Sequence, residues 1–211
     1  MHVELILVRH ALPVRERGVN GAAADPGLAV EGREQSDLLA RWLCAEGIDV
    51  IVSSPARRAR QTAEPLADAL QLPVEVADGL REFDTGAQEY VPVEELRAAN
   101  DPRWQALERG EFYGCVDPAG FRSRVLDAAD GIVAAHPGAT VAAFTHAGVV
   151  NVCAGQLLGV ARDIWLEPGY TSITRIAAAR DGKRWIRTVN ETPHLHPAYL
   201  RLVREAAAGG E

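Results

Sequence analysis

Three apolar segments of this sequence each end in side chains that could bind or attack a phosphate group. In chain order these are Arg9 and His10, Arg57 and Arg58, and Thr145 and His146. Arginine presents a planar, permanently charged fork that matches phosphate oxygens. A neutral histidine can attack phosphorus and carry the phosphoryl group, and a second histidine can donate a hydrogen bond to oxygens on which charge accumulates. These residue types predict a site for a small anionic substrate that needs no metal ion or cofactor.

Such a reaction also needs an acid, because the leaving oxygen departs more easily once it is protonated. The loop over residues 80–86 offers two carboxyl groups. Glu82 is the first candidate for this role, and Asp84 is the alternative.

Apolar runs over residues 5–8, 48–53 and 140–144 are typical of strands that are buried on both faces of a parallel sheet. The carboxyl ends of parallel strands lie at one edge of a sheet, so the histidines and arginines are expected to converge there. Spacing close to 3.6 residues predicts helices between these strands. The expected helices cover residues 31–46, 59–70, 121–133 and 148–158.

Three further strands are expected, over residues 73–76, 172–179 and 184–189. The Asp181-Gly182 pair predicts a hairpin between the last two. Residues 1–211 contain no linker and are interpreted as a single α/β domain. Residues 87–117 are the least regular part, and they form either a cap over the site or a plain surface excursion. In the first case the aromatic residues of this segment line a pocket, and in the second they pack the insertion. These residues are Trp104, Phe112 and Tyr113.

Composition excludes several other classes of protein. Hydrophobic residues make up 47% and charged residues 24% of the chain, which argues against disorder. The net charge of −7 argues against nucleic acid as the main partner. No apolar run is long enough to span a membrane, and the first residues lack the basic region of a signal peptide.

The cysteines and the C-terminal histidines are interpreted as having no role in catalysis. The three cysteines, which are Cys44, Cys115 and Cys153, are far apart in the sequence. They predict reduced thiols in a cytoplasmic protein, and Cys153 is expected in the core. His194 and His196 have a spacing seen in metal sites, but with no carboxylate or cysteine beside them they are interpreted as a polar terminal segment. The last few residues are expected to fray.

Five blocks of the sequence occur in the order found in the histidine phosphatase superfamily, in its phosphoglycerate mutase-like branch, which the chain resembles over residues 3–150. The blocks are Val8-Arg9-His10-Ala11, Leu28-x-x-x-Gly32-x-x-Gln35, Ser53-Ser54-Pro55-x-x-Arg58-Ala59-x-Gln61-Thr62-Ala63, Leu80-x-Glu82-x-x-x-Gly86 and Thr145-His146-Ala147-Gly148.

The resemblance implies a three-layer α/β/α sandwich around a mostly parallel central sheet. It also implies a phosphohistidine intermediate on His10, a phosphate pocket built from Arg9, Arg58 and His146, and Glu82 as the proton donor. In the family pattern the pocket arginine directly precedes an alanine, which selects Arg58 over its neighbour Arg57.

The chain departs from the family pattern at several positions. Ala11 and Ala147 stand where glycine is commoner, and Ala29 replaces the threonine that normally caps the first helix, which weakens that cap by about 1 kcal/mol. The family often places a serine or threonine and then an asparagine after the first histidine to touch the phosphate. This chain has Leu12-Pro13-Val14-Arg15 there, so Arg15 is a candidate for an added substrate-binding cation.

The sequence therefore predicts a metal-independent phosphatase that hydrolyses a small phosphomonoester. Two alternatives remain open: phosphoryl transfer of the phosphoglycerate mutase type, and a non-catalytic module that binds phosphate. The missing serine or threonine and asparagine, together with the short insertion, favour hydrolysis. The small phosphorylated substrate is the expected partner, with neither nucleic acid nor membrane involved, and a homodimer is allowed.

Overall fold

The computed structural model describes residues 2–201. Its first strand, β1 (His2–Arg9), lies in the middle of the sheet and supplies both hydrophobic cores. Val3, Leu5 and Leu7 pack into one core, and Ile6 and Val8 pack into the other. Burial on both faces explains why the strand reads as a continuous apolar run.

The sheet has six strands in the order β4-β3-β6-β1-β7-β8. Their bounds are β3 (Val50–Ser53), β4 (Val74–Val76), β6 (Thr140–Thr145), β7 (Ile173–Ala179) and β8 (Arg184–Glu191). The first four in spatial order are parallel, and β7 and β8 form an antiparallel hairpin beside β1. In this register Arg9 pairs with Thr145, and Ser53 pairs with Phe144. The ends of β1, β3 and β6 therefore lie side by side, as the sequence predicted.

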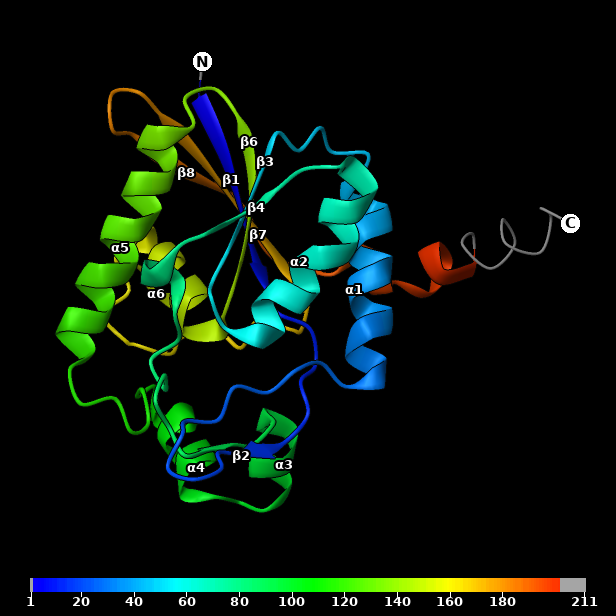
Figure 1. Cartoon of the computed structure of the whole chain (residues 1–211). Coiled ribbons are helices and arrows are strands. Elements are labelled where there is room, and N and C mark those ends of the chain that lie inside the picture. The colour runs from blue at the N-terminus through cyan, green and yellow to red at the C-terminus, as the bar shows by residue number, and fades with distance from the viewer. Residues whose placement is uncertain (1, 202–211) are drawn as a thin grey trace, which may run out of the picture.

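Helices cover both faces of the sheet (Figure 1). On one face lie α1 (Val30–Leu43) and α2 (Arg57–Leu70), and on the other lie α5 (Pro118–Ala135) and α6 (Ala147–Leu158). This arrangement confirms the three-layer sandwich. Helix α1 ends before the predicted residue 46, and Ala29 at its N-cap makes no side-chain hydrogen bond.

Several short elements outside the main sheet and the four long helices were not predicted. Residues 87–117 include β5 (Glu89–Tyr90), α3 (Val93–Ala98) and α4 (Pro102–Arg109), and β5 pairs with β2 (Glu16–Arg17) from the loop after β1. Two single-turn 3₁₀ helices occur at Asp78–Leu80 and Pro193–Leu195. These elements are too short to leave a periodic pattern in the sequence. Figure 1 shows α3, α4 and β2 together beyond the sheet edge.

No helix within residues 2–201 is long and apolar enough to cross a membrane. The predicted fraying concerns residues that lie outside the described part of the chain.

Candidate active site

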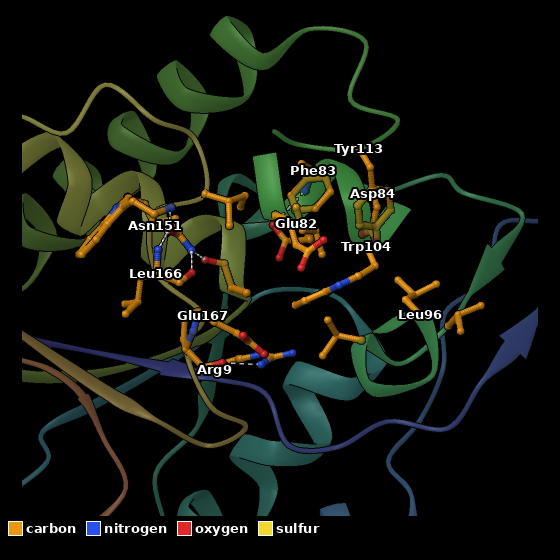
Figure 2. Close-up of a pocket in the computed structure, with 18 of the residues that line it drawn as sticks. Arg9, Glu82, Phe83, Asp84, Leu96, Trp104, Tyr113, Asn151, Leu166 and Glu167 are labelled. Carbon is orange, nitrogen blue, oxygen red and sulfur yellow. Dashed lines mark hydrogen bonds between the residues drawn. The ribbon is translucent and has the colours of Figure 1, made fainter. Parts of the chain in front are cut away.

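A cavity of about 300 Å³ opens at the carboxyl edge of the sheet, between that edge and the segment 87–117. Four of the predicted residues line it: Arg9, His10, Arg58 and Glu82 (Figure 2 labels Arg9 and Glu82). His146 is fully buried directly beside His10, with 5.2 Å between the ring centroids. The five residues predicted to carry the chemistry are thus brought together.

The ring of His10 is held in one tautomer. Its Nδ1 lies 2.8 Å from the carbonyl oxygen of Ala11, and because a carbonyl only accepts, Nδ1 carries the hydrogen. The lone pair therefore sits on Nε2, which accepts a hydrogen bond from Nε of Arg58 at 3.3 Å. Burial, reinforced by the charges of Arg58 and Arg9, holds the pKa of His10 well below its ordinary value. The imidazole is therefore neutral at physiological pH, and the lone pair that could attack phosphorus lies on Nε2, where it faces Arg58.

Residues of three other sequence blocks hold the chain just after His10. The hydroxyl of Thr62 accepts the N–H of Ala11 at 3.0 Å, and the side-chain oxygen of Gln35 accepts the N–H of Leu12 at 3.0 Å. A side chain at Gly32 would come within 2.1 Å of the carbonyl oxygen of Leu12. These contacts explain the glycine, glutamine and threonine of the motifs as supports for the loop that follows His10. Ala11 does not need a positive φ, so alanine is tolerated there.

The two pocket arginines are buried beside aromatic rings. The guanidinium of Arg9 lies 3.9 Å from the ring centroid of Tyr170, and that of Arg58 lies 4.7 Å from that of Tyr90. Arg58 also approaches the carboxylate of Asp84 at 3.8 Å. Within the described residues Arg9 has no carboxylate partner, and its Nε is buried without a hydrogen bond. An anion in the cavity would satisfy this charge.

His146 also has an unsatisfied nitrogen. Its Nε2 lies 2.8 Å from the hydroxyl of Ser54, whereas its Nδ1 is buried with no hydrogen-bond partner among the described residues. Burial and the neighbouring charges of Arg58, His10 and Arg9 hold the pKa of His146 well below its ordinary value. An orphaned polar atom in such a position is unusual and suggests that a ligand completes its bonding.

Glu82 is held where α6 begins. Its Oε2 accepts the N–H of Gly148 at 2.9 Å, and its Oε1 accepts the N–H of Phe83 at 3.0 Å. Burial, with a smaller contribution from the charge of Asp84, raises the pKa of Glu82 to about 7. A carboxyl group with this pKa is protonated for part of the time near neutral pH, as a general acid must be.

The close approach of Glu82 to α6 gives a first prediction. A Cβ at Gly148 would lie 2.3 Å from Oε1 of Glu82, so Gly148→Ala should push the carboxyl group out of place. A displacement of this size is expected to lower kcat/KM for an alkyl phosphate on the order of a hundredfold. Gly131→Ala, in the middle of α5, is the matched control because its Cβ would meet nothing within 4 Å. Equal activity of the two variants would contradict this account of Glu82.

Arg57 and Arg15 are not brought into the cavity. Arg57 is exposed, which agrees with the choice of Arg58. Arg15 is also exposed, and its guanidinium pairs with Glu89 at 2.9 Å and with Glu95 at 3.4 Å. The structure therefore does not bring Arg15 to the cavity in which it was expected to add a cation. Glu89 and Glu95 of the segment 87–117 hold the guanidinium of Arg15 away from the cavity. These ion pairs could not be predicted from the position of Arg15 close to His10 in the sequence.

The aromatic residues of the insertion divide between two roles. Trp104 and Tyr113 line the cavity, whereas Phe112 is buried and packs against Phe83 and Phe121. Cys153 is buried in the core, as predicted.

Sequence reasoning missed three residues that support the end of β1. Thr171 has a positive φ of 57°, which is rare for a β-branched residue, and its N–H donates to the carbonyl of Arg9 at 3.0 Å. His194 is fully buried, and its Nε2 lies 2.8 Å from the hydroxyl of Thr171. Tyr170 lies under Arg9. The interpretation of His194 as part of a polar tail was wrong, since its buried ring contacts Thr171, whose N–H is bonded to the end of β1.

His196, in contrast, is exposed. No group of three or more His, Cys, Asp or Glu side chains in the part of the chain that the structure describes is placed to hold a metal ion.

Comparisons with known proteins agree with this geometry. The family model of the histidine phosphatase superfamily (branch 1) matches residues 5–192. Phosphoserine phosphatase 1 of Hydrogenobacter thermophilus is 35% identical over 167 residues, which cover 75% of this chain and 77% of that protein. The bifunctional protein Rv2228c of Mycobacterium tuberculosis is 32% identical over 203 residues, which cover 90% of this chain and 54% of that protein. This chain thus spans about half the length of the mycobacterial relative.

A solved structure of a phosphoserine phosphatase from Entamoeba histolytica, in complex with phosphoserine, has the same fold. Its TM-score is 0.71 at 22% sequence identity, and the match covers 92% of this chain and 100% of that chain.

Proposed function

The chain belongs to branch 1 of the histidine phosphatase superfamily, and on that premise we propose that it hydrolyses a small phosphomonoester through a phosphohistidine on His10. One observation carries the proposal above the others: Nδ1 of His10 is fixed on a backbone carbonyl, so the lone pair of Nε2 is presented in a cavity beside Arg58.

In the first step Nε2 of His10 attacks phosphorus, and the bond from phosphorus to the ester oxygen breaks. The guanidinium groups of Arg9 and Arg58 and the free Nδ1 of His146 hold the other phosphate oxygens, on which negative charge is spread. Glu82 gives its proton to the departing oxygen, so the alcohol leaves neutral.

In the second step water attacks the phosphohistidine. Glu82, now ionised, takes the proton from this water, and the bond between phosphorus and Nε2 breaks. Inorganic phosphate leaves, and both His10 and Glu82 return to their starting states. The two arginines neutralise the negative charge of the phosphate. The bonds and protons of both steps are accounted for by His10, Glu82 and water.

Two further features complete the proposal. The segment 87–117 acts as a cap, since its residues Trp104 and Tyr113 line the cavity. The substrate is a small phosphorylated molecule, in keeping with the phosphoserine named for two of the similar proteins.

The function is tested by phosphate release from an aryl phosphate between about pH 5 and 8, with a chelator present. Release that survives the chelator is the expected result. The same assay with 3-phosphoglycerate addresses the mutase alternative. Interconversion with 2-phosphoglycerate without phosphate release would replace hydrolysis by mutase chemistry, and phosphate binding without either reaction would indicate a binding module.

The two adjacent arginines provide a matched pair for the phosphate pocket. Arg58→Ala should weaken competitive inhibition by inorganic phosphate at least about tenfold, because it removes a charge-assisted hydrogen-bond donor from a buried site. Arg57→Ala, one residue earlier but exposed, should leave the inhibition constant unchanged. The opposite pattern would move the phosphate pocket to Arg57.

A further inference from the structure

The part of the cavity that lies beyond the phosphate-binding residues is lined mainly by carbon. We define its apolar wall as Leu96, Trp104, Leu107, Ile164, Trp165 and Leu166. Leu96 comes from α3, Trp104 and Leu107 come from α4, and the others follow α6. Figure 2 shows Leu96 and Trp104 on one side of the cavity and Leu166 on the other.

The polar groups along this wall are already bonded to each other. Asn151 accepts the N–H groups of Trp165 and Leu166 on its side-chain oxygen, at 2.9 Å each. Its side-chain nitrogen donates to the carbonyl oxygens of Ala147 and Leu166, also at 2.9 Å each. The indole N–H of Trp165 donates to the carbonyl oxygen of Asn151 at 3.0 Å. None of these donors and acceptors is left to recognise a polar leaving group.

The charges near the wall do not favour an anionic leaving group. Of the three described arginines that line the cavity, Arg9 and Arg58 lie at the phosphate end, and only Arg162 lies beyond it. Arg162 is exposed and donates to the backbone carbonyl of Glu108. The carboxylates of Glu108 and Glu167 also line this end, and Glu167 is already paired with Arg97, so a second negative charge on the substrate would meet two carboxylates, the exposed Arg162 and a guanidinium that is engaged elsewhere.

We infer that the substrate is a phosphomonoester of an apolar alcohol, either alkyl or aryl, without a carboxylate in its leaving group. This inference rests on the proposed function and adds to it the chemical class of the leaving group. The cavity of about 300 Å³ has room for such a group beside the phosphate, because a cavity of about half that volume holds a benzene ring. Trp104 presents a fixed surface, since the guanidinium of Arg97 covers one face of its indole at 4.3 Å.

The test is kcat/KM for ethyl, butyl and hexyl phosphate, together with phosphoserine and 3-phosphoglycerate. The alkyl esters have nearly the same leaving-group chemistry, so a dependence on chain length reports contact with the apolar wall. We expect kcat/KM to rise roughly fourfold for each methylene that the wall buries. Butyl phosphate should exceed both carboxylated esters at least tenfold.

Variants distinguish the contact between the substrate and the apolar wall from general effects on folding. Leu107→Ala should lower the ratio of hexyl to ethyl phosphate at least about fourfold. Leu158→Ala is the matched control, because Leu158 is half-exposed and does not line the cavity. The ratio of two substrates on one variant is independent of how much of the protein is folded, so a poorly folding variant still gives a result. If Leu107→Ala left the ratio of hexyl to ethyl phosphate unchanged, the substrate would not contact the apolar wall.

Other outcomes distinguish this inference from the proposed function. A rate that is independent of chain length, or a preference for phosphoserine that is lost in Arg162→Ala, would overturn the apolar leaving group and leave the hydrolysis intact. No phosphate release from any of these esters or from an aryl phosphate would overturn both.

Discussion

Replacing His10 with alanine should lower kcat for phosphate release by a thousandfold or more, on the order of what enzymes lose with their nucleophile. The imidazole has no substitute, because His10 is the only histidine of the described residues that lines the cavity. The loss is expected with aryl and alkyl phosphates alike, since both need the same attack on phosphorus. Steady-state release of phosphate measures it.

His196→Ala is the control for this substitution, because His196 is exposed and does not line the cavity. It should retain the full rate. If His10→Ala kept more than about a tenth of the wild-type kcat, the histidine would be a binding residue and water would attack phosphorus directly.

The second large effect is expected from Glu82→Gln, and it should depend on the leaving group. Alkyl phosphates need a proton on the departing oxygen, so their kcat should fall about 10²- to 10⁴-fold. Activated aryl phosphates expel a stable phenolate and should lose much less. Equal losses on both kinds of substrate would remove Glu82 from the role of acid.

The pH dependence gives the same test a second readout. Burial and the charge of Asp84 raise the pKa of Glu82 to about 7, and in the proposed mechanism the protonated form of Glu82 is the acid. The kcat/KM for alkyl phosphates, which reports groups of the free enzyme, should therefore fall as the pH rises through about 7, and this fall should be absent in Glu82→Gln. Asp84→Asn removes the neighbouring charge, so it should move the fall to lower pH without abolishing it. If Asp84→Asn instead showed the dependence on the leaving group, Asp84 would be the acid.

Much of the site follows from the sequence because it is built at the ends of three buried strands. Continuous apolar runs identify such strands, and the geometry of parallel sheets then places Arg9, His10 and His146 at one edge. The choice of Arg58 over Arg57 came from the family pattern, and the burial of Arg58 on α2 beside the exposed Arg57 agrees with it.

What escaped prediction depends on contacts between residues that are distant in the sequence. Arg15 is close to His10 along the chain, but its ion pairs are with Glu89 and Glu95, more than 70 residues later. His194 shows no local sign of burial, and only the turn at Thr171 brings it against the end of β1. Neither contact leaves a periodic or compositional signal.

The most direct test of the central claim is rapid quenching of the enzyme during turnover of an activated aryl phosphate. With such a leaving group the first step needs no acid, so breakdown of the phosphoenzyme limits the rate and the intermediate accumulates. The account predicts a burst of phenol close to one equivalent per enzyme, with an acid-labile phosphoryl group on the peptide that contains His10. Linear release of phenol with no labelled enzyme, or a phosphoryl group on another residue, would contradict it.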